Sequence, residues 1–411
     1  MKKILIVLAV PAGLIILTLV LLLILKPRQP GASRRISTEA ELDLYLEQIT
    51  ENATPPSLSL TVLKGDKLTY SKAFGMADAP LSRPARTSTV YPWYSVTKLF
   101  TSAAILKLAD EGKLSLSDPV KKYIPDYNTV NKEGEGVSIT IDQLLNHESG
   151  LPDIIPEGLN WIHSSREAPP NQTDFFNQKM IEEYRVVEFT PGSRVRYSNT
   201  GFIVLGVIIE KITGTAYENY IEETILKPLS MEKTGFSGTS GMEQHLATGS
   251  QHRINAFTPL LMIYGKRGFM KQLVRETEDH RMWFMPVNTD YSPSTGLNGT
   301  SEDLARFGYA LMTSRRLEDG TAIGIESIAG MQKPYTMKEL ERRYSRIKQY
   351  GYGLKAWKMK GYRIYGHSGG GPGFAALLAF VPERNLVVAV SANDTSLDRM
   401  EILETVMKMD W

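Results

Sequence analysis

Strand-like segments stand at both ends of this chain and helix-like segments fill its middle, and this distribution most constrains the fold. Near the amino end, residues 58–63 and 68–73 flank Lys64-Gly65-Asp66-Lys67, which predicts a β-hairpin. Strand patterns return late, in residues 353–358, 362–367, 374–381 and 386–392. We therefore predict an α+β fold: an antiparallel sheet formed by both chain ends, flanked by helices in an α/β-type sandwich, with an inserted, mainly helical lobe.

The domain that carries this fold is expected over residues 37–411, with the helical lobe over about 76–312. Its core would be large, because 42% of the 411 residues are hydrophobic. Residues 257–284 mix apolar and basic side chains, and three interpretations stay open: a lid over the site, a surface that lies on the membrane, or core of the helical lobe with solvated charges, of which the last is favoured. The chain has no cysteine, which excludes disulfides, thiol catalysis and thiolate metal sites.

The amino terminus predicts a membrane anchor. Residues 1–3 are a short basic start, residues 4–25 contain no charge, and residues 26–36 form a Pro/Gly/Arg linker. An apolar helix of this length spans about 33 Å, enough for a bilayer core of about 30 Å. A cleaved signal peptide is the alternative, but its apolar region is usually shorter. Residues 1–35 carry six Lys/Arg and no acid, so the remainder is mildly acidic and has no basic field for nucleic acid.

A candidate nucleophile lies in Ser95-Val96-Thr97-Lys98, which opens an apolar run of helical periodicity over residues 99–109. Residues three apart on a helix share a face, so the Lys98 amine can approach the Ser95 hydroxyl. Ser95 would lie at the helix N-terminus, where unpaired N–H groups favour developing negative charge. A serine beside an amine is a recognised nucleophile arrangement.

Two later motifs are candidates to complete this pair. Tyr197-Ser198-Asn199 precedes a helix predicted over residues 201–212. There Tyr197 would take the serine proton and return it to the leaving group, and Asn199 would position Lys98 and a substrate amide. The second motif, His367-Ser368-Gly369-Gly370, ends a predicted strand. Its glycines permit close approach of a ligand, and the Gly370 N–H together with the Ser95 N–H would form an oxyanion hole.

Each motif alone also has an ordinary interpretation. A loop tyrosine with a helix-capping asparagine, and a tight glycine turn with a solvated histidine, account for the two later motifs. The S-x-x-K pattern occurs three times, at Ser95, Ser230 and Ser345, and about two occurrences are expected by chance. Only Ser95 is followed by a strongly apolar helix. We also set aside Lys233-Thr234-Gly235, because no strand is predicted before it and it lies only 36 residues after Tyr197.

Taken together, the three motifs resemble those of the serine β-lactamase/penicillin-binding-protein superfamily. They occur in the same order, with gaps of 102 residues from 95 to 197 and 170 from 197 to 367. The most similar branch is the class C β-lactamase-related group, which includes D-Ala-D-Ala carboxypeptidases, D-amino acid peptidases and esterases. Residues 144–152 and 228–236 resemble the L-L-x-H-x-S-G-L-P and P-L-G-M-x-x-T-G-F segments of that group. The resemblance covers about residues 40–410.

The resemblance implies a serine hydrolase that works through an acyl-enzyme without a metal or an organic cofactor. Ser95 would be the acylated nucleophile, Lys98 the proton acceptor and Tyr197 the shared acid/base. Substrate binding and the oxyanion hole would fall to Asn199, His367, Ser368, Gly369 and Gly370. His147, within the L-L-x-H segment, would be structural. The implied substrates are D-amino acid peptides or esters of the cell wall, or small esters.

The chain departs from the family pattern in ways that bear on activity. His367 replaces the lysine of typical class C β-lactamases, as in certain carboxypeptidases and esterases of the group, and no glutamate matches the class A deacylation residue. We therefore expect slow or absent β-lactam turnover. The family places its catalytic domain outside the cytoplasm, so we expect this location although the charges flanking residues 4–25 favour the opposite orientation. The alternative is a weak penicillin-binding or cell-wall-sensing module without efficient turnover.

Overall fold

The computed structural model describes residues 29, 31, 36–52, 54–155, 157–163, 169–237, 241–253, 258, 269–278, 280–313, 338–339 and 349–411. The expected anchor at residues 4–25, the basic start at 1–3 and most of the linker at 26–36 lie outside these residues. Within the described ranges, no single helix has the length and apolar character needed to cross a bilayer. One pair of helical segments, Asn199–Thr213 and Tyr217–Leu226, meets these criteria together but is bent by 80°.

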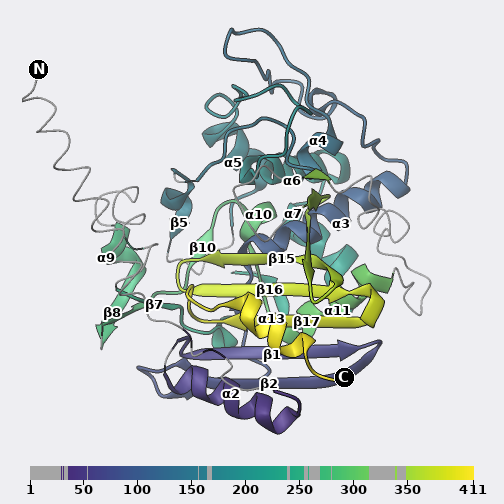
Figure 1. Cartoon of the computed structure of the whole chain (residues 1–411). Coiled ribbons are helices and arrows are strands. Elements are labelled where there is room, and N and C mark those ends of the chain that lie inside the picture. The colour runs from purple at the N-terminus through teal and green to yellow at the C-terminus, as the bar shows by residue number, and fades with distance from the viewer. Residues whose placement is uncertain are drawn as a thin grey trace, which may run out of the picture.

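A nine-stranded antiparallel sheet forms the body of the described protein (Figure 1). Its strand order is β12-β13-β14-β15-β16-β17-β1-β2-β3. Amino-terminal β1 pairs with carboxy-terminal β17 from Leu58↔Ala392 to Lys64↔Leu386, which confirms the predicted sheet built from both chain ends. The strands are β1 (Ser57–Lys64), β2 (Lys67–Asp78), β3 (Arg83–Pro84), β12 (Lys338–Glu339), β13 (Gln349–Gly351), β14 (Leu354–Met359), β15 (Tyr362–Gly371), β16 (Phe374–Val381) and β17 (Leu386–Ala392).

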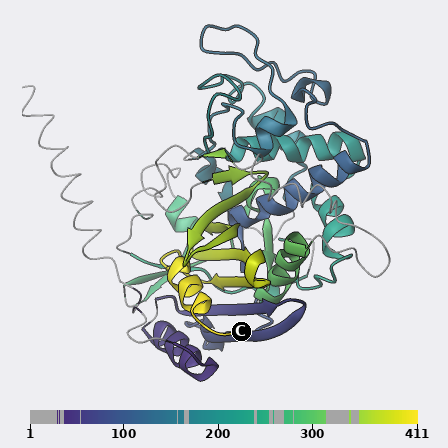
Figure 2. The same cartoon turned by 45° about the vertical axis from the view of Figure 1, so that its right-hand side comes forward.

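Helices cover both faces of this sheet (Figures 1 and 2). Helices α2 (Glu39–Glu51) and α13 (Arg399–Met407) pack on one face, and α11 (Ser301–Thr313) packs on the other. Alternate residues of β17 point into the two cores. Val388 lies in the core beneath α2 and α13, and Val387 lies in the core beneath α11. Because both faces are buried, the central strands read as nearly continuous apolar runs rather than as an alternating pattern.

The lobe is organised around α3 (Thr97–Asp110), which is buried on almost every side. Phe100 of α3 stacks on Phe307 of α11 with 3.6 Å between ring centroids, so α3 is fixed against the helix that covers the sheet. A helix that is apolar all round is expected in such an interior position. Further helices of the lobe include α4 (Ile141–Leu145), α5 (Gln172–Lys179), α6 (Asn199–Thr213), α7 (Tyr217–Ile221) and α10 (Ser292–Thr295).

The inserted region also contains three small sheets that the sequence patterns did not predict. Their strand orders are β4-β11-β6, β7-β9-β8 and β10-β5. The strands are β4 (Tyr91–Pro92), β5 (Ile162–His163), β6 (Thr234–Phe236), β7 (Ser250–His252), β8 (Val274–Glu278), β9 (Arg281–Phe284), β10 (Asn288–Thr289) and β11 (Leu297–Gly299).

The described part of residues 257–284 forms β8, β9 and the short helix α9 (Phe269–Leu273), and Phe269, Leu273, Met282 and Phe284 are buried in the same hydrophobic core as α3. The described residues directly before Lys233 form a turn rather than a strand, and Thr234 and Gly235 open strand β6. Strand β6 belongs to a small separate sheet, and the Thr234 hydroxyl donates a hydrogen bond to Asp303.

Candidate active site

Ser95 lies in a tight 3₁₀ turn, Tyr94–Val96, that leads directly into α3. Tyr94 has a left-handed backbone with φ of +46°, which is uncommon for a bulky residue, and its hydroxyl donates to the carbonyl of Pro372 at 2.9 Å. That bond ties the turn to the loop after β15. Ser95 itself remains half-buried, so the turn presents its hydroxyl where a substrate can reach it.

Lys98 is fully buried one helical turn after Ser95. Its Nζ donates to Asn199 Oδ1 at 2.7 Å and to the Ser294 carbonyl at 2.9 Å, and lies 3.4 Å from Ser95 Oγ. Burial lowers the pKa of Lys98 well below its usual range, and the nearby Asp153 carboxylate opposes this shift. In its neutral form this amine would have two N–H donors, engaged by the two carbonyl oxygens, and a lone pair free to accept the proton of the Ser95 hydroxyl.

Tyr197 approaches Ser95 from the segment that precedes α6. Its hydroxyl donates to Ser95 Oγ at 2.9 Å, across 102 residues of sequence. The Tyr197 ring lies 5.1 Å from Lys98 Nζ and 5.6 Å from Lys355 Nζ, measured to the ring centroid. The structure thus brings the predicted hydroxyl, amine and phenol within bonding reach, and Ser95 Oγ is their common contact.

Asn199 is the first residue of α6 and is held by a carboxylate that sequence reasoning missed. Asp153 Oδ1 accepts hydrogen bonds from the Asn199 side-chain amide at 2.9 Å and from its backbone N–H at 3.1 Å. These bonds direct the Asn199 oxygen toward Lys98. The only signal for Asp153 in the sequence is its position immediately after the stretch 144–152, and a lone loop aspartate did not point to a role in the site.

The third motif packs its backbone against the Ser95 turn. A Cβ added at Gly369 would lie 1.8 Å from the Trp93 carbonyl oxygen and 3.2 Å from the Ser95 nitrogen, so only glycine allows this approach. Gly370 follows on the exposed rim of β15, which places its backbone where a substrate can approach. The oxyanion role of the Gly370 N–H remains a prediction.

His367 is fully buried, and both of its ring nitrogens are engaged inside the protein. Nδ1 donates to the Ser368 carbonyl at 2.7 Å, and Nε2 accepts from the Tyr350 hydroxyl at 2.9 Å. Burial lowers the pKa of His367 well below its usual value, with the charges of Lys355 and Lys98 adding to the effect. A neutral His367 therefore holds Tyr350 in place.

His147 occupies a similar supporting position. It is buried with a left-handed φ of +58°, and its Nδ1 accepts from the Ser198 N–H at 3.2 Å. Its ring lies 4.5 Å from the Tyr197 ring, between centroids. These contacts agree with the structural role that the family resemblance implies, because they fix the segment that carries Tyr197.

Replacing Gly369 by Ala should displace β15 from the Ser95 turn, because the new methyl group would clash with backbone rather than with a flexible side chain. A displacement of about 1 Å between reacting groups can cost about 100-fold in rate. We expect the acylation rate of Ser95, followed with a fluorescent penicillin, to fall by at least that factor. Gly136→Ala is the matched control, since its Cβ would meet nothing within 4 Å. Equal rates in wild type and Gly369→Ala would contradict the close packing.

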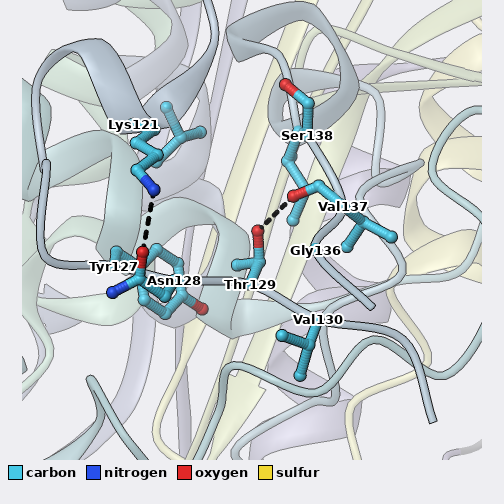
Figure 3. Close-up of a pocket in the computed structure, with 10 residues that line it drawn as sticks. Lys121, Tyr127, Asn128, Thr129, Val130, Gly136, Val137 and Ser138 are labelled. Carbon is cyan, nitrogen blue, oxygen red and sulfur yellow. Dashed lines mark hydrogen bonds between the residues drawn. The ribbon is translucent and has the colours of Figure 1, made fainter. Parts of the chain in front are cut away.

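A separate cavity of about 320 Å³ lies in the loops of the lobe (Figure 3). Lys121 donates to Asn128 at 2.9 Å and Thr129 donates to the Val137 carbonyl at 2.7 Å along its wall. None of the predicted site residues lines it. Among the residues that the structure describes, no cluster of three or more His, Asp or Glu side chains could hold a metal ion.

Comparison with known proteins places these features in context. The family model described as Beta-lactamase matches residues 42–406. Protein flp of Staphylococcus aureus (strain N315) is 32% identical over 229 residues, which cover 54% of this chain and 43% of flp. Penicillin-binding protein 4* of Bacillus subtilis (strain 168) is 28% identical over 335 residues, or 80% of this chain and 66% of that protein. The chain thus matches less than half the length of flp.

Solved structures show the same fold. The octameric penicillin-binding protein homologue from Pyrococcus abyssi has a TM-score of 0.69 at 27% identity, over 90% of this chain and 76% of that one. D-amino acid amidase from Ochrobactrum anthropi SV3, complexed with L-phenylalanine, has a TM-score of 0.69 at 20% identity, over 88% and 96%. At that identity the second likeness concerns the fold alone.

Proposed function

The chain belongs to the beta-lactamase family, and from this premise we propose that it is a serine hydrolase that cleaves amide or ester bonds through an acyl-enzyme on Ser95. One observation carries the proposal: Ser95 Oγ accepts a hydrogen bond from the Tyr197 hydroxyl at 2.9 Å while the buried Lys98 amine lies 3.4 Å away. The Ser95 hydroxyl therefore has a proton acceptor, the Lys98 amine, and a proton donor, the Tyr197 phenol, already in place.

In the proposed reaction, Lys98 Nζ takes the Ser95 proton as Ser95 Oγ attacks the substrate carbonyl. The backbone N–H groups of Ser95 and Gly370 bind the oxyanion. Tyr197 gives its proton to the leaving amine or alcohol as the carbon–heteroatom bond breaks, and the proton on Lys98 restores Tyr197. Water then attacks the acyl-enzyme, gives up its proton to the same groups, and releases Ser95 and a carboxylic acid.

We propose D-amino acid peptides or esters of the cell wall, or small esters, as substrates. Support comes from the likeness to penicillin-binding protein 4* and to the penicillin-binding protein homologue, of which this chain covers 66% and 76%. We further propose that residues 4–25 anchor the protein in the membrane with its catalytic domain outside the cytoplasm. The uncharged length of that segment supports this part of the proposal.

Intact-mass analysis tests the proposed activity. The full chain is incubated with D-Ala-D-Ala peptides, D-alanyl esters, short-chain nitrophenyl esters and penicillin, and the mass gain of the protein is followed over time. We expect an acyl adduct with at least one ester or peptide, and a long-lived adduct with penicillin. Steady β-lactam hydrolysis near 10² s⁻¹, in the upper part of the common enzyme range, would contradict the expected slow turnover. Adducts with penicillin alone would favour the binding module.

A further inference from the structure

Lys355 brings a second lysine to the site, and no predicted motif contains it. It lies in β14, where it pairs with Gly366, the residue before His367. Its Nζ is 3.4 Å from Ser368 Oγ and 5.6 Å from the centroid of the Tyr197 ring. The neighbouring strand therefore supplies a lysine beside the third motif, in which His367 replaces the lysine of typical class C enzymes.

Among the described residues, no carboxylate lies within ion-pair distance of Lys355 Nζ. Burial, followed by the charge of Arg399, lowers the pKa of Lys355 to about 7. The titratable groups that face it from surrounding elements are Lys98 of α3, His147 after α4, Tyr197 before α6, Tyr350 of β13, His367 of β15 and Arg399 of α13.

An unpaired, half-buried ammonium group destabilises a fold, because desolvation is not offset by a counter-charge. Arg399 adds repulsion and is itself held near the third motif, where it donates to the Gly369 carbonyl. Exposed lysines are easily accommodated, as Lys358 on the same strand shows. Residues that lower stability at a site commonly serve its function.

Resting on the proposed function, we propose that Lys355 is a positioning residue of this active site, which substitutes from β14 for the lysine missing from the third motif and prepares Lys98 to receive the Ser95 proton. The positive charge of Lys355 disfavours protonation of Lys98, on which its repulsion acts directly. This repulsion keeps a proton acceptor ready next to Ser95, while Tyr197 stays protonated as the donor.

Hydrolysis of an uncharged ester, p-nitrophenyl butyrate, tests this role with Lys355→Met, Lys355→Arg and the control Lys358→Met. Charges within about 6 Å shift a pKa by about one to three units, so we expect Lys355→Met to lower kcat about 10- to 100-fold. The acidic limb of its pH–rate profile should move to higher pH by about one unit. Lys355→Arg should recover part of the rate, and Lys358→Met should match wild type.

Acylation by penicillin, which carries a carboxylate, separates this role from direct substrate binding. A similar loss with the ester and with penicillin is the expected result. A loss with penicillin alone would overturn the proposal and make Lys355 a substrate contact. Unchanged rates and an unchanged pH profile in Lys355→Met would also overturn it. Failure of wild type to form any adduct on Ser95 would refute the proposed function itself, and this inference with it.

Thermal unfolding gives an independent readout. The folded-state pKa of Lys355 lies below that of a free lysine, so between about pH 7 and pH 10 the unfolded chain binds the extra proton and stability rises with pH. Below about pH 7 Lys355 is charged in the folded protein, and the full free-energy cost of its partly buried charge is present. Lys355→Met should therefore have a higher Tm than wild type at pH 6, with the difference shrinking toward pH 10. A lower Tm at pH 6 would show that Lys355 stabilises the fold and would contradict its functional role.

Discussion

Ser95→Ala should abolish the acyl-enzyme, because Ser95 Oγ is the hydroxyl that both the Lys98 amine and the Tyr197 phenol contact. The proposed mechanism needs Ser95 Oγ for every bond that forms with the substrate, so covalent labelling by a fluorescent penicillin should disappear. Hydrolysis of the ester and peptide panel should fall by at least about 10³-fold, as losses of a nucleophile in catalytic units usually do.

The fold of this variant should survive, since Ser95 is half-buried and its hydroxyl can be lost without opening a large cavity. The matched control is Ser230→Ala, which removes the serine of a second S-x-x-K pattern on an exposed turn. Normal labelling of Ser230→Ala with none in Ser95→Ala is the expected pair of results. Retained labelling in a folded Ser95→Ala would place the nucleophile elsewhere.

Lys98→Met should reduce the acylation rate of Ser95 by about 10²- to 10⁴-fold, the usual contribution of a general base. Methionine fills the buried space but cannot accept a proton. Lys98→Arg should be no more active than Lys98→Met, because a guanidinium is not deprotonated in proteins and therefore cannot accept the Ser95 proton. In wild type, acylation should be lost as pH falls through the pKa of Lys98, which burial holds well below its usual range.

Lys233→Met serves as the control, because Lys233 occupies the same position in the second S-x-x-K pattern and is exposed. The acylation rates of wild type, Lys98→Met, Lys98→Arg and Lys233→Met are measured by stopped-flow fluorescence with fluorescent penicillin. Circular dichroism verifies that each protein is folded. An active Lys98→Arg would mean that the amine acts through its charge alone, and the neutral-base role of Lys98 would then be wrong.

The architecture followed from the sequence because its signals are local and strong. The hairpin of β1 and β2 and the late run of apolar strands left few ways to build one sheet, and the pairing of Leu58 with Ala392 closes it. The three motifs could be ordered along the chain by comparison with a family. Their convergence on Ser95 Oγ adds geometry that spacing alone does not contain.

Other parts of the site could not be predicted, because they depend on packing between distant segments. Asp153 is one loop aspartate among many until α6 brings Asn199 onto it. Lys355 lies in an ordinary strand, and only its register opposite Gly366 turns it toward the third motif. The short strands β6 to β11 have two to five residues each and are stabilised by their partner strands. They are too short for a periodic sequence pattern to predict them.

The account depends on Ser95, Lys98 and Tyr197 working as one proton-transfer unit. The most direct test measures Ser95 acylation rates in Lys98→Met, Tyr197→Phe and the double variant. Groups that act as a unit are strongly non-additive, so the double variant should be about as slow as the slower single variant. If the two losses multiply instead, Lys98 and Tyr197 act independently on Ser95, and the single catalytic unit that we infer from their shared contact does not exist.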